Sequence, residues 1–117
     1  MYKPITLIIL FLSFYLPYCQ VSITKEPSWI INEEYNPNAV APENGLYGGT
    51  HVLLYTEQVH VDREEAYIKN VAKAVEYSGI QTISSVVADY DPSYQELRFH
   101  HIDVIRNGKR INRLNQQ

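Results

Sequence analysis

The sequence is almost without cysteine: Cys19 is the single one among 117 residues. If an export signal is removed after it, the mature chain has no cysteine at all. It then forms no disulfide, even in a compartment that would allow one. The fold must therefore rest on its hydrophobic contacts alone.

The sequence also lacks an apolar run long enough for a permanent membrane span, which takes ~20 residues. Its longest run, Ile5 to Leu16, follows Lys3 and ends at Pro17, the pattern of a secretory signal peptide. We predict a signal peptide over 1–19, cleavage before Gln20, and a mature chain in the periplasm or on the cell surface without a transmembrane span. A lipid anchor at Cys19 is the less favoured alternative, because small residues do not precede the cysteine.

There is little net charge, −3 at pH 7, which argues against nucleic acid and anionic membranes as partners. The charges are unevenly placed. Glu26 to Glu65 contains eight acidic residues and one basic residue, whereas Arg98 to Arg113 contains five basic residues and one acidic residue. Two interpretations stay open: strand faces of opposite sign that pair across a sheet, or a strip that binds phosphate or polysaccharide.

Regular hydrophobic periodicity is missing from residues 20–48, where prolines and asparagines recur. We predict an irregular lead-in there, with Trp29 plugging the side of a core. From His51 to Val61 apolar and polar residues alternate, which predicts a strand with one mainly apolar face. A further strand is predicted over Ile80 to Tyr90.

Two turn motifs organise the last third of the chain. Asp91-Pro92 is typical of a turn, since proline presets φ and the carboxylate can accept bonds from backbone N–H groups ahead of it. Asn107-Gly108 predicts a tight hairpin, because both residues tolerate positive φ. Between them, Leu97 to Arg106 is predicted as one strand, with a β-bulge near His100 or with both faces buried. The role predicted for Asp91, Pro92, Asn107 and Gly108 is structural.

The same region carries a family resemblance. Two groups of spaced turn and apolar residues carry it: Tyr77-Ser78-Gly79-Ile80-Gln81, and Tyr90-Asp91-Pro92-Ser93-Tyr94-Gln95 followed by Leu97, Phe99, Ile102, Val104, Ile105, Arg106, Gly108 and Lys109. Together they resemble a domain of unknown function from exported bacterial proteins. That domain typically precedes a transglutaminase-like domain in Bacteroidetes-type bacteria. The resemblance covers residues 49–114, implies a β-rich fold and brings no catalytic residues with it.

Residues 66–77 can be interpreted in two ways. Local propensity favours a helix, because Ala, Lys and Glu are good helix formers. The resemblance favours a strand antiparallel to residues 51–61, and we predict the strand. The fold class expected is all-β, an antiparallel sheet or partial β-sandwich of about five strands in a domain over 49–117 that is truncated at its C-terminal end.

The sequence offers no convincing reaction centre. A transglutaminase-like centre needs a cysteine nucleophile with a histidine and a carboxylate, so any such core would lie beyond residue 117. Adjacent strand residues point to opposite faces, which argues against one metal held by both His100 and His101. Other residues considered for a metal or for paired acids are His51, His60, Asp89, Asp91, Glu96 and Asp103. We assign none of them, and predict no catalytic residue, metal or cofactor.

Two functions are compatible with this pattern. The first is a non-catalytic accessory module of an exported transglutaminase-like protein, which packs beside a downstream core or holds its polypeptide substrate. The second is a self-standing envelope module that binds a glycan or peptide through exposed tyrosines. A metal-dependent hydrolase is a third and weaker hypothesis.

Overall fold

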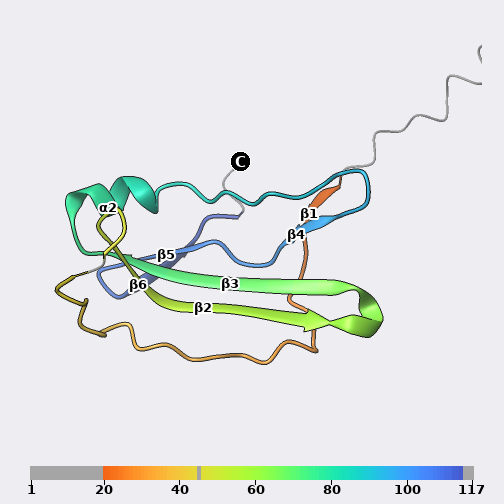
Figure 1. Ribbon diagram of the computed structural model, residues 1–117, viewed down its shortest axis with the longest axis horizontal. Helices are drawn as coiled ribbons and strands as arrows, with labels where there is room; N and C mark the ends of the chain where they lie inside the picture. Colours follow the sequence, from red (N-terminus) through yellow and green to blue (C-terminus); the bar gives the residue numbers. More distant parts are fainter. Residues whose placement is uncertain (1–19, 45, 115–117) are drawn as a thin grey trace, which may run out of the picture. The chain divides into compact units, whose positions relative to one another are not determined.

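The computed structural model describes residues 20–44 and 46–114 (Figure 1). The signal peptide predicted over 1–19, with Cys19, lies outside the described residues. The described residues form two compact units, one made of 20–25 with 90–114 and the other of Glu26–Asp89. Among these residues, no helix has the length and apolar character needed to cross a membrane.

The Glu26–Asp89 unit is built on one long antiparallel hairpin, β2 (Thr50–His60) and β3 (Glu65–Ala74). A 3-10 turn, η2 (Val61–Arg63), connects them, and Glu64 closes it in the left-handed region with φ 53°. The strand predicted over 51–61 is confirmed. The strand is also confirmed for residues 66–77, up to Ala74, because pairing with β2 outweighs the local helix propensity.

The lead-in lies along this hairpin and is held by specific bonds. The Ile31 amide donates to Gln58 Oε1 at 2.8 Å, and Gln58 Nε2 donates to the Ile31 carbonyl at 2.7 Å. Trp29 Nε1 donates to Glu65 Oε2 at 2.9 Å, and its ring meets the His60 ring edge-on, with centroids 5.3 Å apart. Trp29 is therefore half-buried against the side of the sheet, where it connects the lead-in to the end of the hairpin.

The strand predicted over Ile80 to Tyr90 is wrong. Residues Tyr77–Thr82 form a short helix, α2, and residues 85–90 are irregular. The physical reason is a close backbone contact. Gly49 O accepts bonds from Val75 N at 2.9 Å and from Glu76 N at 3.3 Å, and a Cβ on Gly79 would lie 2.1 Å from that same oxygen. The chain turns at Gly79 onto Gly49 after β3 has ended. In the described part of the chain, residues 80–90 pair with no strand.

The other unit has two short ladders. Strand β1 (Val21–Ile23) pairs in parallel with β4 (Leu97–Phe99), and β5 (Asp103–Arg106) pairs antiparallel with β6 (Lys109–Asn112). The structure thus differs from the expected irregular lead-in at β1. Between β5 and β6, Asn107 and Gly108 adopt φ of 52° and 71°, the geometry of a type I′ turn.

The single strand predicted over Leu97 to Arg106 is instead divided into β4 and β5, which pair with different strands. The division falls at His100, whose Nδ1 lies 3.0 Å from Thr24 O and 3.2 Å from Thr24 Oγ1. Farther on, Arg113 N donates to Ile102 O at 2.7 Å. These bonds replace ladder pairing over 100–102, so neither a bulge nor a doubly buried strand is present.

The all-β class is confirmed. The described strands form three two-stranded ladders, two antiparallel and one parallel, rather than a single antiparallel sheet. Within residues 20–44 and 46–114 no apolar side chain is fully buried, and the one buried polar residue is Thr56 at 8% exposure. Both units therefore expose apolar side chains that the core of a conventional domain would cover.

Candidate binding surfaces

The hairpin has one exposed face, which we call the open face: Tyr55, Glu57, Val59, Ala66, Ile68 and Asn70. These side chains share a face because Tyr55 lies opposite Asn70, Glu57 opposite Ile68, and Val59 opposite Ala66. Tyr55, Val59 and Ile68 are 60%, 63% and 59% exposed. An apolar strand face this exposed is typical of a surface that contacts a partner.

The opposite face of the hairpin is covered by the lead-in through polar contacts. Thr56 Oγ1 donates to Glu33 Oε1 at 3.3 Å, and Lys69 Nζ donates to Asn32 Oδ1 at 2.9 Å. The Tyr67 hydroxyl donates to the Glu26 carboxylate. Burial, together with this acceptor and its negative charge, raises the pKa of Tyr67 well above its usual range, so the hydroxyl stays a donor. The lead-in therefore occupies one face of the hairpin and leaves the other to solvent.

Glu57 is the one charged side chain on the open face. It is flanked along β2 by Tyr55 and Val59, and lies across from Ile68 on β3. Within the described part of the chain its carboxylate makes no hydrogen bond or ion pair. The lysines of β3, Lys69 and Lys73, alternate onto the other face.

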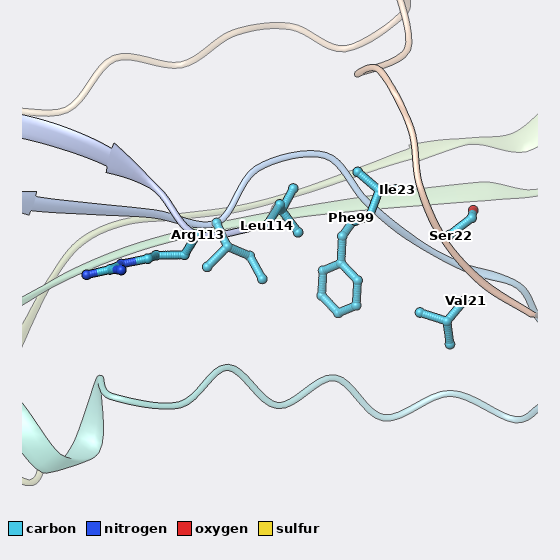
Figure 2. Close-up of a pocket in the computed structure, with 7 residues that line it drawn as sticks. Val21, Ser22, Ile23, Phe99, Arg113 and Leu114 are labelled. Carbon is cyan, nitrogen blue, oxygen red and sulfur yellow. The ribbon is translucent and has the colours of Figure 1, made fainter. Parts of the chain in front are cut away.

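The second unit contains a shallow groove of about 440 Å³ (Figure 2). It is lined by Val21, Ser22, Ile23, Phe99, Ile102, Arg113 and Leu114. Figure 2 shows the Val21 and Phe99 side chains extending to the same side of the paired strands, as the parallel register of β1 and β4 requires. The lining is mainly apolar, so the groove suits an apolar side chain rather than a charged group.

The histidines considered from the sequence are dispersed. His60 packs on Trp29, His100 bonds Thr24, and His101 is exposed. His51 is half-buried, and its Nδ1 has no hydrogen-bond partner within residues 20–44 and 46–114. Across the described residues no three His, Cys, Asp or Glu side chains gather in a way that could hold a metal ion.

The carboxylates considered for acid–base work are engaged separately. Asp103 pairs with Arg110 and Glu96 pairs with Arg98, each at 3.1 Å, while Asp89 is exposed. Asp91 Oδ1 accepts from Ser93 N at 2.9 Å and from Ser93 Oγ at 2.6 Å. Its carbonyl accepts from Gln95 N at 2.8 Å, so Asp91 and Pro92 begin a turn.

The Asp91 turn should respond to pH. The Ser93 hydroxyl and amide hold the pKa of Asp91 below its usual range, so the ionised form stabilises the fold. A lowered pKa gives stability that is present above the unfolded pKa, near 3.8, and is lost as the pH falls through the folded value. We expect Asp91→Ala to be less stable than the parent at pH 7, with the difference vanishing in strong acid. Urea melts at several pH values check this, and a difference that does not shrink as the pH falls below 3.8 would contradict it.

Residues 60–117 match the family described as "Domain of Unknown Function with solved-structure structure (DUF3857)". No curated protein and no solved structure matches the chain significantly. The match spans β3, α2 and the strands from β4 to β6, but not most of β2 or the lead-in. Because the family has no known function, the match assigns no catalytic residue to this chain.

The sequence did not single out Glu57 or the open face as a site. The alternation over 51–61 was visible, and it marks Tyr55 and Val59 as members of one apolar face. No local pattern shows that the lead-in covers the more polar face of the hairpin and not this apolar one.

Proposed function

We propose, from the match of residues 60–117 and the resemblance to domains beside transglutaminase-like cores, that this chain is a non-catalytic accessory module. Its role is to hold a polypeptide for such a core. The observation that carries the proposal is the open face, with three apolar side chains each more than half exposed on a paired strand scaffold. A regular sheet face of this kind offers a polypeptide a series of side-chain contacts at a fixed spacing.

The test uses an exported protein that carries both this chain and the core. We expect the double variant Tyr55→Ser/Ile68→Ser to raise the KM for a polypeptide substrate about tenfold and to leave turnover of a small amide unchanged. A small amide is too short to contact the open face while it is bound at the core, so its turnover reports on the core alone. Val87→Ser is the matched control, since Val87 is 79% exposed but lies outside the ladders. Equal loss on both substrates, or no loss on either, would refute the proposal.

The proposal includes export to the periplasm or cell surface, supported by Lys3 and the apolar run that follows it. Mass spectrometry of the protein from the cell envelope should find Gln20 as the first residue. An intact Met1, or a diacylglyceryl group on Cys19, would contradict this.

A second candidate function, a glycan-binding envelope module, is favoured by one observation. Tyr47 and Tyr77 are 88% and 79% exposed, and they lie on the two segments that Gly49 and Gly79 bring into contact. Exposed aromatic rings on a fixed backbone offer flat apolar surfaces with a polar tip. If this function is correct, Tyr47→Ala/Tyr77→Ala should abolish retention on immobilised envelope polysaccharide. Retention that the double variant keeps would exclude it.

A further inference from the structure

We infer that the open face binds an extended polypeptide segment with a basic side chain between two apolar ones, at positions i, i+2 and i+4. This inference rests on the proposed polypeptide-holding function and names the chemistry of what is held. It follows from the order of side chains on β2, where Tyr55, Glu57 and Val59 stand on one face at that same spacing.

The spacing argues for an extended partner. Side chains two residues apart on a strand lie about 7 Å apart, so Tyr55 and Val59 are separated by about 13 Å along the open face. A segment with the same two-residue period can place two apolar side chains beside them at once. The Ile68 side chain, opposite Glu57, widens the apolar surface on the β3 side.

The charge of the face argues for a basic residue at the middle position. Among the residues that the structure describes, no cation lies beside Glu57 on the open face. Lys69 is bound to Asn32 and to Glu33 O on the covered face. Covering an ionised carboxylate with apolar groups is costly unless an opposite charge pairs with it. A lysine at the middle position satisfies that requirement, whereas a neutral or acidic residue does not.

The Glu26–Asp89 unit as a whole has a net negative charge, the same sign as Glu57. Residues 26–89 carry ten acidic and three basic side chains. A net negative field of this kind attracts basic segments and repels acidic ones at moderate ionic strength. The local pairing at Glu57 and the wider field therefore select the same class of polypeptide.

The test measures binding of fluorescent peptides by anisotropy, using the full chain and peptides with Leu-Thr-Lys-Thr-Leu, Leu-Thr-Gln-Thr-Leu or Leu-Thr-Glu-Thr-Leu at the centre. We expect the Lys peptide to bind about fivefold more tightly than the Gln peptide. This ratio corresponds to the binding free energy of a single ion pair that is partly exposed to solvent. The Glu peptide should bind most weakly. The difference should shrink as salt is raised.

Variants of the chain assign the preference to Glu57. Glu57→Gln should remove the difference between the Lys and Gln peptides, and Glu57→Lys should reverse the order of the Lys and Glu peptides. Glu34→Gln is the matched control: it removes the same charge from an exposed side chain of the lead-in and should keep the preference. Because Glu57 is exposed and has no ion pair or hydrogen bond with another described residue, these substitutions should leave the unfolding midpoint nearly unchanged.

The outcomes separate the inference from the function it rests on. Equal binding of all three peptides, lost in Tyr55→Ser/Ile68→Ser, would overturn the charge preference and keep the polypeptide-holding function. No binding of any peptide would overturn the inference. The proposed function is tested independently, by the KM of the parent and of Tyr55→Ser/Ile68→Ser for a polypeptide substrate of the core. Self-association in sedimentation that Glu57→Lys abolishes would assign the open face to a second copy and overturn the inference.

Discussion

Replacing Gly79 with alanine is expected to destabilise the Glu26–Asp89 unit by about 3 kcal/mol, because the new Cβ has no room. It would lie 2.1 Å from Gly49 O and 3.2 Å from the Ala74 Cα, and both of these are backbone atoms that cannot rotate away. The chain must then separate α2 from the Gly49 turn. That separation would also weaken the two bonds that Gly49 O accepts. Denaturant unfolding followed by tryptophan fluorescence would measure the loss through Trp29.

The comparison variant is Gly108→Ala, and its unfolding is followed by far-UV circular dichroism because Gly108 and Trp29 belong to different units. Gly108 has φ +71°, so alanine is strained there, but a Cβ would meet nothing within 4 Å. We expect a loss of about 1 kcal/mol from backbone conformation alone. If Gly79→Ala cost no more than Gly108→Ala, the close packing of Gly79 on Gly49 would not stabilise the fold as described.

The second large effect is expected at Trp29. Trp29→Ala removes the ring contact with His60 and the bond to Glu65, and we expect a loss of about 2–3 kcal/mol for this half-buried side chain. The lead-in should detach with it, because the Ile31 bonds to Gln58 lie two residues farther on. Hydrogen exchange should then show faster exchange at the Ile31 amide.

A conservative variant separates the two contributions of Trp29. Trp29→Phe keeps an aromatic ring for His60 but removes the N–H that donates to Glu65, so we expect a loss of about 1 kcal/mol. Val40→Ala serves as a control within the lead-in, since Val40 is 91% exposed. Slow exchange at the Ile31 amide in Trp29→Ala would show that other contacts hold the lead-in.

The parts of the fold that could be predicted from the sequence are those with local causes. Asn107-Gly108 forms its turn because both residues reach positive φ at low cost, wherever the hairpin lies in the molecule. The alternation over 51–61 identified β2 for the same reason, since a two-residue period is a property of the segment itself. At β3 the local propensity indicated a helix, and the strand followed from the family resemblance.

The parts that could not be predicted depend on distant contacts. Nothing within Ile80 to Tyr90 shows that Gly79 meets Gly49, thirty residues earlier, and that contact is what turns this segment into α2 and irregular chain. Likewise, residues 21–23 carry no strong strand pattern, and they become β1 because β4 supplies a partner.

The residues of the open face could be predicted from the sequence, but their exposure could not. Alternation placed Tyr55 and Val59 on one apolar face, and the usual expectation is that an apolar face is buried. The lead-in instead offers polar groups to the other face: its carboxylates Glu26 and Glu33, and the Ile31 backbone. These donors and acceptors match Tyr67, Thr56 and Gln58, so hydrogen bonding decides which face is covered.

The parallel ladder of β1 with β4 has a consequence for the order of folding. Val21 lies opposite Leu97, so forming this ladder closes a loop of more than seventy residues, whereas β2 and β3 meet through one short turn. Closing a long loop has a large entropic cost and delays contact formation, while hairpins form in about 1–10 μs. In a refolding experiment the amides of β2 and β3 should therefore become protected first. The Leu97 amide donates to Gln20 O at 2.8 Å. It should become protected later, once folding of residues 26–89 has shortened the loop that joins β1 and β4.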